Sequence, residues 1–222
     1  MISVITPTAR GDEALELVEK ALKRQTHKDF EWIVQKKTPV KEGNVWSLNH
    51  DYNVAIKKAK GELIISFQDW TYADPDCLEK FWTHYKQEPK TLVSAVGNKY
   101  KDDTWREVVW QDPRMREDQG TWYGCYFADI EFNLSAVPRE AFYAIGGFDE
   151  KLDRYFGMDG YGVADRLNIL GGYDFKLDQT IKSYSLEHGR PKGWEKHNAL
   201  HGPYQKRRKD YVVNPVLPYL EK

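Results

Sequence analysis

The stretch of sequence that decides the fold class is Asn53-Val-Ala-Ile-Lys-Lys-Ala-Lys-Gly61-Glu-Leu-Ile-Ile-Ser-Phe-Gln-Asp69. Its first part continues a series of apolar residues at helical spacing that begins at Leu48, and Gly61 suits the position just after a helix. Residues 63–67 form a short apolar run that is typical of a buried strand. A helix that leads directly into a buried strand indicates an α/β protein.

The same alternation extends on both sides of this stretch. The pattern predicts strands at residues 2–6, 30–34, 63–67 and 92–96, and helices at residues 14–22, 48–59 and 75–85. Asp12 and Ser47 are candidate N-caps of the first two helices. Short connections between alternating elements indicate a parallel sheet with right-handed crossovers. Such sheets bind ligands beyond the carboxyl ends of their strands, which here are Thr6-Pro7-Thr8, Gln35-Lys36-Lys37 and Gln68-Asp69-Trp70.

The second half of the chain is less regular. Residues 104–110, 121–132, 175–177 and 181–184 are strand-like, and residues 138–144 and 163–170 have helical character. A chain of 222 residues fits one large domain, or one domain with a tail. We expect the domain to cover residues 1–188 and to be followed by a C-terminal extension, residues 189–222.

Composition excludes several classes of protein. The formal net charge is −1, which argues against a protein that wraps nucleic acid. The longest apolar stretch is far shorter than a membrane helix, and no secretory signal precedes the first strand. Cys77 and Cys125 form neither a zinc motif nor a disulfide framework, so we expect two reduced thiols in a cytoplasmic protein.

Positive charge is concentrated near the C-terminus. The region from Arg190 to Lys209 holds seven basic residues and one acidic residue, with Trp194 and Tyr204 among them. A solvated tail is one interpretation of this pattern. The other is a clamp over an anionic ligand, either a diphosphate or a phospholipid surface that the protein touches peripherally.

Four blocks of the sequence, in order, resemble glycosyltransferase family 2. The first runs from Ile2 to Thr8 and continues through Arg10, Arg24-Gln25-Thr26 and residues 31–34. The second is the stretch from Asn53 to Asp69. The third is Pro138-Arg139-Glu140 with Gly146-Gly147-Phe148-Asp149-Glu150. The fourth runs from Asp159 to Arg166-Leu167, and His188 occupies the place of a histidine found after the last strand in many GT-A enzymes.

This resemblance implies a GT-A fold, which is a Rossmann-like, mostly parallel sheet flanked by helices. A donor-binding half would cover about residues 1–100, and a smaller acceptor half about residues 101–188. The implied activity is inverting transfer of a sugar from a nucleotide-diphosphate sugar, with a UDP-sugar favoured, to a saccharide or lipid-linked acceptor. Negative charge grows on the departing diphosphate, so a divalent cation, Mn²⁺ or Mg²⁺, is expected there.

The sequence departs from the family pattern in three places. Gln35-Lys36-Lys37 stands where acidic residues usually follow the second strand. The Asp-x-Asp motif is reduced to Asp69-Trp70-Thr71, and the Glu-Asp pair to Met158-Asp159-Gly160. A non-catalytic protein that binds sugar nucleotides or glycans on the same scaffold is therefore the alternative to an enzyme.

The resemblance and the strand ends together nominate the site residues. Asp159 is the candidate catalytic base; a helix N-cap is the alternative role, and the two roles are compatible. Asp69 and His188 are the candidate metal ligands, although His188 is alternatively a structural histidine. The candidate donor-binding residues are Thr6, Pro7, Thr8, Arg10, Gln35, Asn53, Gln68 and Asp69. The candidate acceptor-binding residues are Trp122, Tyr123, Gly147 and Phe148, for which core packing is the alternative.

Overall fold

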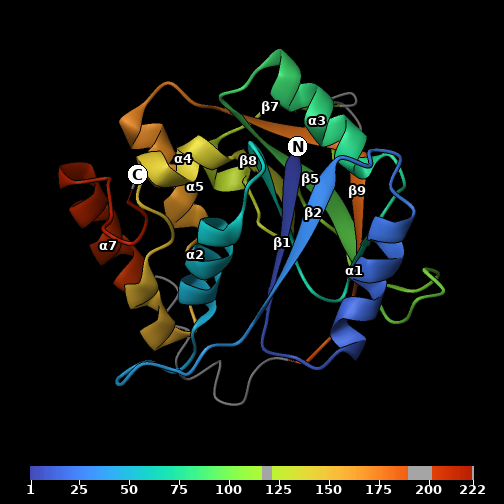
Figure 1. Cartoon of the computed structure of the whole chain (residues 1–222), viewed down its shortest axis with the longest axis horizontal. Coiled ribbons are helices and arrows are strands. Elements are labelled where there is room, and N and C mark those ends of the chain that lie inside the picture. The colour runs from blue at the N-terminus through green and yellow to red at the C-terminus, as the bar shows by residue number, and fades with distance from the viewer. Residues whose placement is uncertain (117–121, 190–201, 222) are drawn as a thin grey trace.

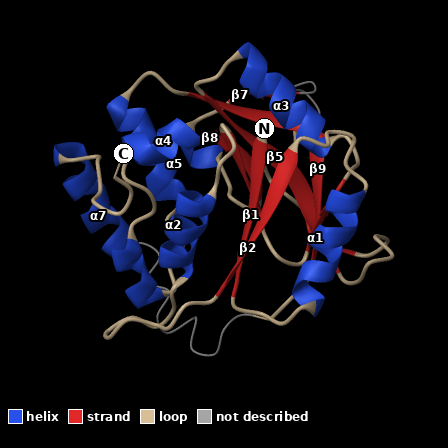
Figure 2. Ribbon diagram, in the orientation of Figure 1, coloured by secondary structure: helices blue, strands red, loops and turns tan. Residues whose placement is uncertain are grey.

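The computed structural model describes residues 1–116, 122–189 and 202–221. In these residues one sheet of nine strands forms the centre of the molecule, and helices cover both of its faces (Figures 1 and 2). The main path of the sheet has the order β2-β1-β3-β8-β5-β9-β4, with β6 paired to β5 and β7 paired to β9. The expected α/β class with a mostly parallel sheet is confirmed.

The N-terminal part of the sheet follows the predicted alternation. β1 (Ile2–Thr8), β2 (Phe30–Lys36) and β3 (Leu63–Phe67) are parallel, with β1 between the other two. α1 (Glu13–Lys23) connects β1 to β2, and α2 (Leu48–Lys58) connects β2 to β3. The carboxyl ends of β1, β2 and β3 therefore meet at one edge of the sheet, which we call the carboxyl edge.

One central strand was not predicted. β8 (Leu134–Pro138) lies antiparallel between β3 and β5 (Thr91–Tyr100). The helix expected over residues 138–144 is real, but α4 (Arg139–Ala144) starts only where β8 ends. All five residues of β8 are buried and include Ser135, so a strand covered on both faces lacks the alternation that would mark it in sequence.

The remaining strands complete the far side of the sheet. β9 (Asp174–Leu186) is one long strand parallel to β5, where the sequence suggested two short strands. β4 (Thr71–Ala73) pairs with β9, and β6 (Val108–Trp110) and β7 (Trp122–Gly124) pair with β5 and β9. Two turns of 3₁₀ helix, η2 (Phe127–Asp129) and η3 (Glu150–Tyr155), lie in the second half.

Each face of the sheet has its own hydrophobic core. α1 and α3 (Cys77–Gln87) pack on one face, against side chains that include Leu63, Ile65 and Phe67 of β3. α2, α4 and α5 (Gly160–Leu170) pack on the other face, against Ile64. Successive β3 side chains from Leu63 to Ile65 thus pack into opposite cores, which is why this strand is almost entirely apolar, with Ser66 as its one polar residue.

The helix caps differ from those expected. The Ser47 side chain accepts no capping bond and instead donates to the carboxylate of Asp51. Asp153 of η3 caps the helix instead, because its carboxylate accepts hydrogen bonds from the backbone N–H groups of Asn49 and His50 in the first turn of α2. A residue about a hundred positions away therefore anchors this helix to the second half of the chain.

The described part of the expected C-terminal extension packs against the domain. α7 (Gly202–Val213) lies beside α5, and Tyr211 and Leu220 are buried. The backbone N–H groups of Leu217 and Leu220 donate to the carbonyls of Ile145 and Gly146. Within the described residues, no helix is long and apolar enough to span a membrane.

Gly146 tests the docking of this segment. Its φ is +70°, and a Cβ would lie 1.6 Å from the carbonyl oxygen of Leu217. We expect Gly146→Ala to lower the free energy of unfolding by about 2–5 kcal/mol, because overpacking adds to the cost of left-handed backbone. Gly43 lies in an exposed turn with a φ of +78° and no described atom within 4 Å of a Cβ, so Gly43→Ala should cost only about 1–2 kcal/mol. Urea unfolding measures both, and equal losses would contradict the docking.

Candidate functional site

Thr8 and Asp69 meet where β1 and β3 end. Because these strands are adjacent and parallel, their last residues arrive side by side at the carboxyl edge. The Thr8 hydroxyl donates to Oδ2 of Asp69 at 2.6 Å, and both residues are buried. The structure thus brings together two predicted donor-site residues that are 61 positions apart.

Arg10 joins this pair to His188. One guanidinium nitrogen donates to Oδ1 of Asp69 at 2.8 Å, and the other lies 2.9 Å from Nδ1 of His188, just after β9. The Arg10 backbone N–H also donates to the Thr8 hydroxyl. We call Thr8, Arg10, Asp69 and His188 the strand-end cluster.

The electrostatics of the cluster are set by Arg10. Burial and the neighbouring Arg10 charge lower the pKa of His188 from its ordinary value, so the ring is neutral at pH 7 and its Nδ1 accepts from the guanidinium. Asp69 balances one positive charge. A guanidinium has five N–H donors, and the Arg10 side chain is 32% exposed, so donors remain for an anion that arrives from solvent.

The cluster does not fit a divalent cation as it stands. Both Asp69 oxygens and Nδ1 of His188 are already engaged by Thr8 and Arg10. A cation placed between Asp69 and His188 would lie against the Arg10 guanidinium and be repelled by it. Among the residues that the structure describes, no group of three His, Cys, Asp or Glu side chains is arranged to hold a metal.

Other predicted donor residues have packing roles. The Thr6 hydroxyl donates to the carbonyl of Phe67 and accepts from the Trp32 indole, and Pro7 pairs in register with Gln35. The Gln35 side chain accepts from Lys58 of α2.

The side chain of Asn53 is hydrogen-bonded to the turn that follows α4. Its side chain exchanges hydrogen bonds with the backbone of Phe148 and donates to Glu150. Its amide is fully occupied on the α2 side of the sheet, so the structure gives it a role in fixing this turn rather than in contacting a donor.

Gln68 connects the strand-end cluster to α5. It follows β3 directly, and its amide donates to the Met158 sulfur at 3.4 Å. The segment before α5 therefore lies at the carboxyl edge, as the family resemblance implied.

Asp159, the candidate base, lies in a buried ionic network. Its Oδ2 is 2.6 Å from Nη2 of Arg166, which is itself fully buried, and accepts the backbone N–H of Asp149 at 2.7 Å. The Tyr211 hydroxyl donates to Oδ1 at 3.4 Å. Burial raises the pKa of Asp159 to about 6, while the Arg166 charge opposes that rise. Its side chain makes no N-cap bond.

The acceptor predictions divide in two. Phe148 is fully buried and stacks on Tyr52 and Phe142, and a Cβ on Gly147 would meet Asn53 at 2.4 Å. These two residues belong to the core and do not form an acceptor wall. Trp122 and Tyr123 lie on β7 opposite Asp178 and Leu177 of β9, and their side chains lie outside the described part of the structure.

Three aromatic residues at the carboxyl edge were missed. Trp70 follows Asp69 with φ of 57°, and Phe156 precedes α5 with φ of 55°, a region that large side chains rarely adopt. Trp46 lies edge-to-face on Phe156 with centroids 5.3 Å apart. The indole N–H groups of Trp46 and Trp70 are buried donors for which the described residues provide no acceptor. Nothing in the sequence signals positive φ at a tryptophan.

This architecture is the GT-A glycosyltransferase fold. The structure matches GalNAc-T7, solved with UDP, GalNAc and Mn²⁺, at a TM-score of 0.66 and 14% identity over 98% of this chain and 52% of that one. It matches S. aureus TarS 1–349, solved with UDP-GlcNAc, at a TM-score of 0.67 and 11% identity over 96% of this chain and 66% of that one. The TarS structure with UDP gives a TM-score of 0.60 at 11% identity, over 96% of this chain and 70% of that one.

The chain thus spans about half of the GalNAc-T7 chain and about two thirds of the TarS chain. No family model matches the sequence, and no curated protein matches it.

Asp159→Asn distinguishes a structural from a catalytic role. Because the change leaves the Arg166 charge buried without a counterion, we expect the free energy of unfolding to fall by about 3–5 kcal/mol. Glu19→Gln is the control, since the Glu19–Lys23 pair is exposed and should be worth less than about 1 kcal/mol. Denaturant unfolding measures both. If the Asp159→Asn protein has wild-type stability, the structural role of Asp159 is excluded and only the role of catalytic base is left.

Proposed function

We propose that the chain is a glycosyltransferase that binds the diphosphate of a nucleotide-diphosphate sugar at the strand-end cluster. The observation that carries the proposal is the Arg10 guanidinium, held between Asp69 and His188 at the carboxyl edge. Ligands of parallel α/β sheets bind beyond this edge. The solved neighbours with this fold contain UDP or UDP-GlcNAc, which supports a UDP-sugar as the donor.

The chemistry of the donor explains the need for Arg10. Sugar transfer breaks the bond between the anomeric carbon and a diphosphate oxygen, and that oxygen keeps the electron pair. A guanidinium that faces the leaving group stabilises this charge through charge-assisted hydrogen bonds. Asp69 and His188 hold the guanidinium in place before the donor arrives, and the Thr8 hydroxyl holds Asp69.

The acceptor is proposed to be a saccharide or a lipid-linked sugar. The region from Arg190 to Lys209 is the candidate segment for peripheral membrane contact. Arg207 pairs with Asp149 and Asp210, and Arg208 pairs with Asp165, so these two charges are engaged within the protein. Residues 190–201 lie outside the described residues.

A second candidate function is binding of the nucleotide sugar without transfer. The observation in its favour is that Asp159 gives both carboxylate oxygens to the buried network and is itself only 1% exposed. An inverting transfer needs a base within hydrogen-bond reach of the acceptor hydroxyl. Release of UDP from a UDP-sugar, measured with and without a panel of oligosaccharide acceptors, distinguishes the two functions.

The proposed role of Arg10 predicts binding that is independent of metal. UDP should bind in excess chelator with a Kd within about 3-fold of that in Mn²⁺, and Arg10→Gln should weaken binding about 10-fold or more, as loss of a charge-assisted hydrogen bond implies. Isothermal titration calorimetry measures both.

Arg139→Gln is the matched control for this experiment. Arg139 lies at the opposite edge of the sheet, where its side chain donates to the Ala59 carbonyl. UDP binding should be unchanged in this variant. Binding that appears only with Mn²⁺, or that is equal in Arg10→Gln and wild type, would contradict the proposal.

A further inference from the structure

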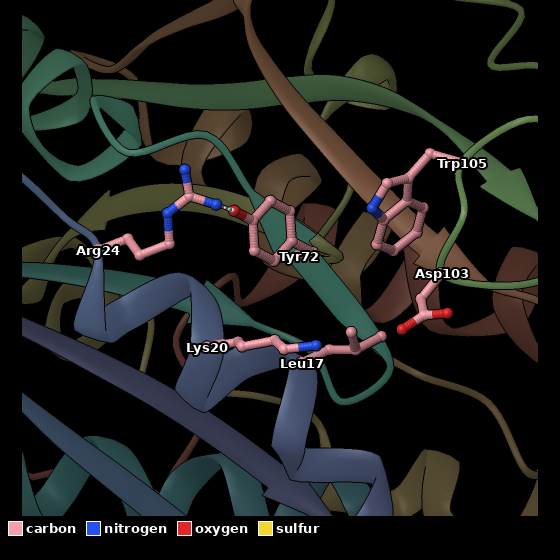
Figure 3. A pocket seen from close by; sticks show the side chains of 6 residues that line it. All are labelled: Leu17, Lys20, Arg24, Tyr72, Asp103 and Trp105. Carbon is pink, nitrogen blue, oxygen red and sulfur yellow. Dashed lines mark hydrogen bonds between the residues drawn. The ribbon is translucent and has the colours of Figure 1, made fainter.

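A cavity of about 160 Å³ lies between α1, β4 and the loop that follows β5 (Figure 3). Leu17 and Lys20 of α1 form one side together with Arg24, the residue that follows this helix, and Tyr72 of β4 also lines the cavity. Asp103 and Trp105 close it from the loop. None of these six residues belongs to the strand-end cluster.

The cavity is separate from the strand-end cluster. α1 starts at the carboxyl edge, where the Ala14 carbonyl accepts the backbone N–H of Trp70, and runs away from it. Lys20 and Arg24 lie six and ten residues further on, which corresponds to about 9 and 15 Å along the helix. A ligand can therefore occupy the cavity while a nucleotide occupies the carboxyl edge.

The residues that line the cavity carry a net positive charge. Lys20 and Arg24 are one helical turn apart, so their charges repel each other. Arg24 donates to the Tyr72 hydroxyl, and across residues 1–116, 122–189 and 202–221 no ion pair joins Lys20 or Arg24 to a carboxylate. Lys23 on the same helix differs, because it pairs with Glu19 at 2.8 Å. One acid, Asp103, lines the cavity, so its net charge favours an anion.

The opposite wall is aromatic and strained. Tyr72 and Trp105 stack with centroids 5.9 Å apart, and Trp105 also contacts Tyr100 and Tyr184. The φ of Trp105 is 58°, a left-handed conformation that costs about 1–2 kcal/mol. Backbone strain of this kind is characteristic of ligand clamps. The indole of Trp105 lines the same cavity as Lys20 and Arg24.

We propose that this cavity binds a single sugar unit that carries a negatively charged group, a uronate or a sugar phosphate. Tyr72 and Trp105 supply flat apolar surface for the sugar ring, and Lys20 and Arg24 supply charge-assisted hydrogen bonds to its anionic substituent. The cavity is smaller than the roughly 300–1,000 Å³ that encloses a drug-sized ligand, so it suits one ring rather than a nucleotide sugar. The proposal does not depend on the proposed function.

Titration calorimetry with four probes tests this inference. The probes are methyl glucuronide, glucose 6-phosphate, methyl glucoside and inorganic phosphate. We expect one or both charged sugars to bind at least 10-fold more tightly than methyl glucoside and inorganic phosphate, and the preferred charged sugar identifies the substituent. If inorganic phosphate binds as tightly as the charged sugars, the sugar ring is not recognised and the proposal is wrong. If methyl glucoside binds as tightly as the charged sugars, the negative charge is not recognised and the proposal is equally wrong.

Variants locate the binding. Arg24→Gln and Trp105→Phe should each weaken binding of the preferred sugar about 10-fold. Lys23→Gln should leave this binding unchanged, because Lys23 already pairs with the carboxylate of Glu19. Thermal unfolding verifies that each variant is folded. UDP binding should be the same in Arg24→Gln and wild type, so failure of this proposal and failure of the proposed function can be told apart. Sugar binding that survives both Arg24→Gln and Trp105→Phe would refute the assignment.

Discussion

The buried ion pair between Arg166 and Asp159 is the interaction on which the second half of the chain depends. A guanidinium in the interior costs several kcal/mol unless its donors are satisfied. Here they reach the carbonyls of Gly162 and Ile145 as well as Asp159. Asp159 in turn accepts from Asp149, whose carboxylate receives the hydroxyls of Tyr211 and Tyr219. One arginine thereby fixes the start of α5, the turn after α4 and the C-terminal segment relative to one another.

The carboxyl edge is organised by a different arginine. Arg10 and Arg166 both pair with an aspartate that the sequence marks as functional, but their surroundings differ. Asp69 and Arg10 lie at the strand ends with Arg10 partly open to solvent, whereas Asp159 and Arg166 are enclosed by α4, α5 and α7. The same chemical pair is therefore partly open to solvent in one place and fully enclosed in the other.

The sequence predicted those features that depend on local periodicity and on strand ends. Alternating strands and helices brought Thr8 and Asp69 together, and the family resemblance added Arg10 and His188. The sequence alone could not show that Asn53 and Phe148 face the core, because their burial depends on which other elements pack over them. β8 escaped detection for the same reason: a strand that is buried on both faces carries no alternating pattern. The cap on α2 comes from Asp153, too distant in the chain for any local signal.

The position of β9 has a consequence for the order in which the protein assembles during synthesis. β1, β2 and β3 can pair once the first 67 residues exist, since β3 ends at Phe67. β5 pairs with β8 and β9, and Thr91 has its β9 partner only at Asp174. β3 gains its outer partner only when β8 has been made, so until residue 138 the growing chain carries a half-sheet whose open edge is β3, a strand with four apolar residues out of five. Contacts of such long range form slowly, so the nascent chain depends on protection of the β3 edge until β8 leaves the ribosome and of the β5 edge until β9 does.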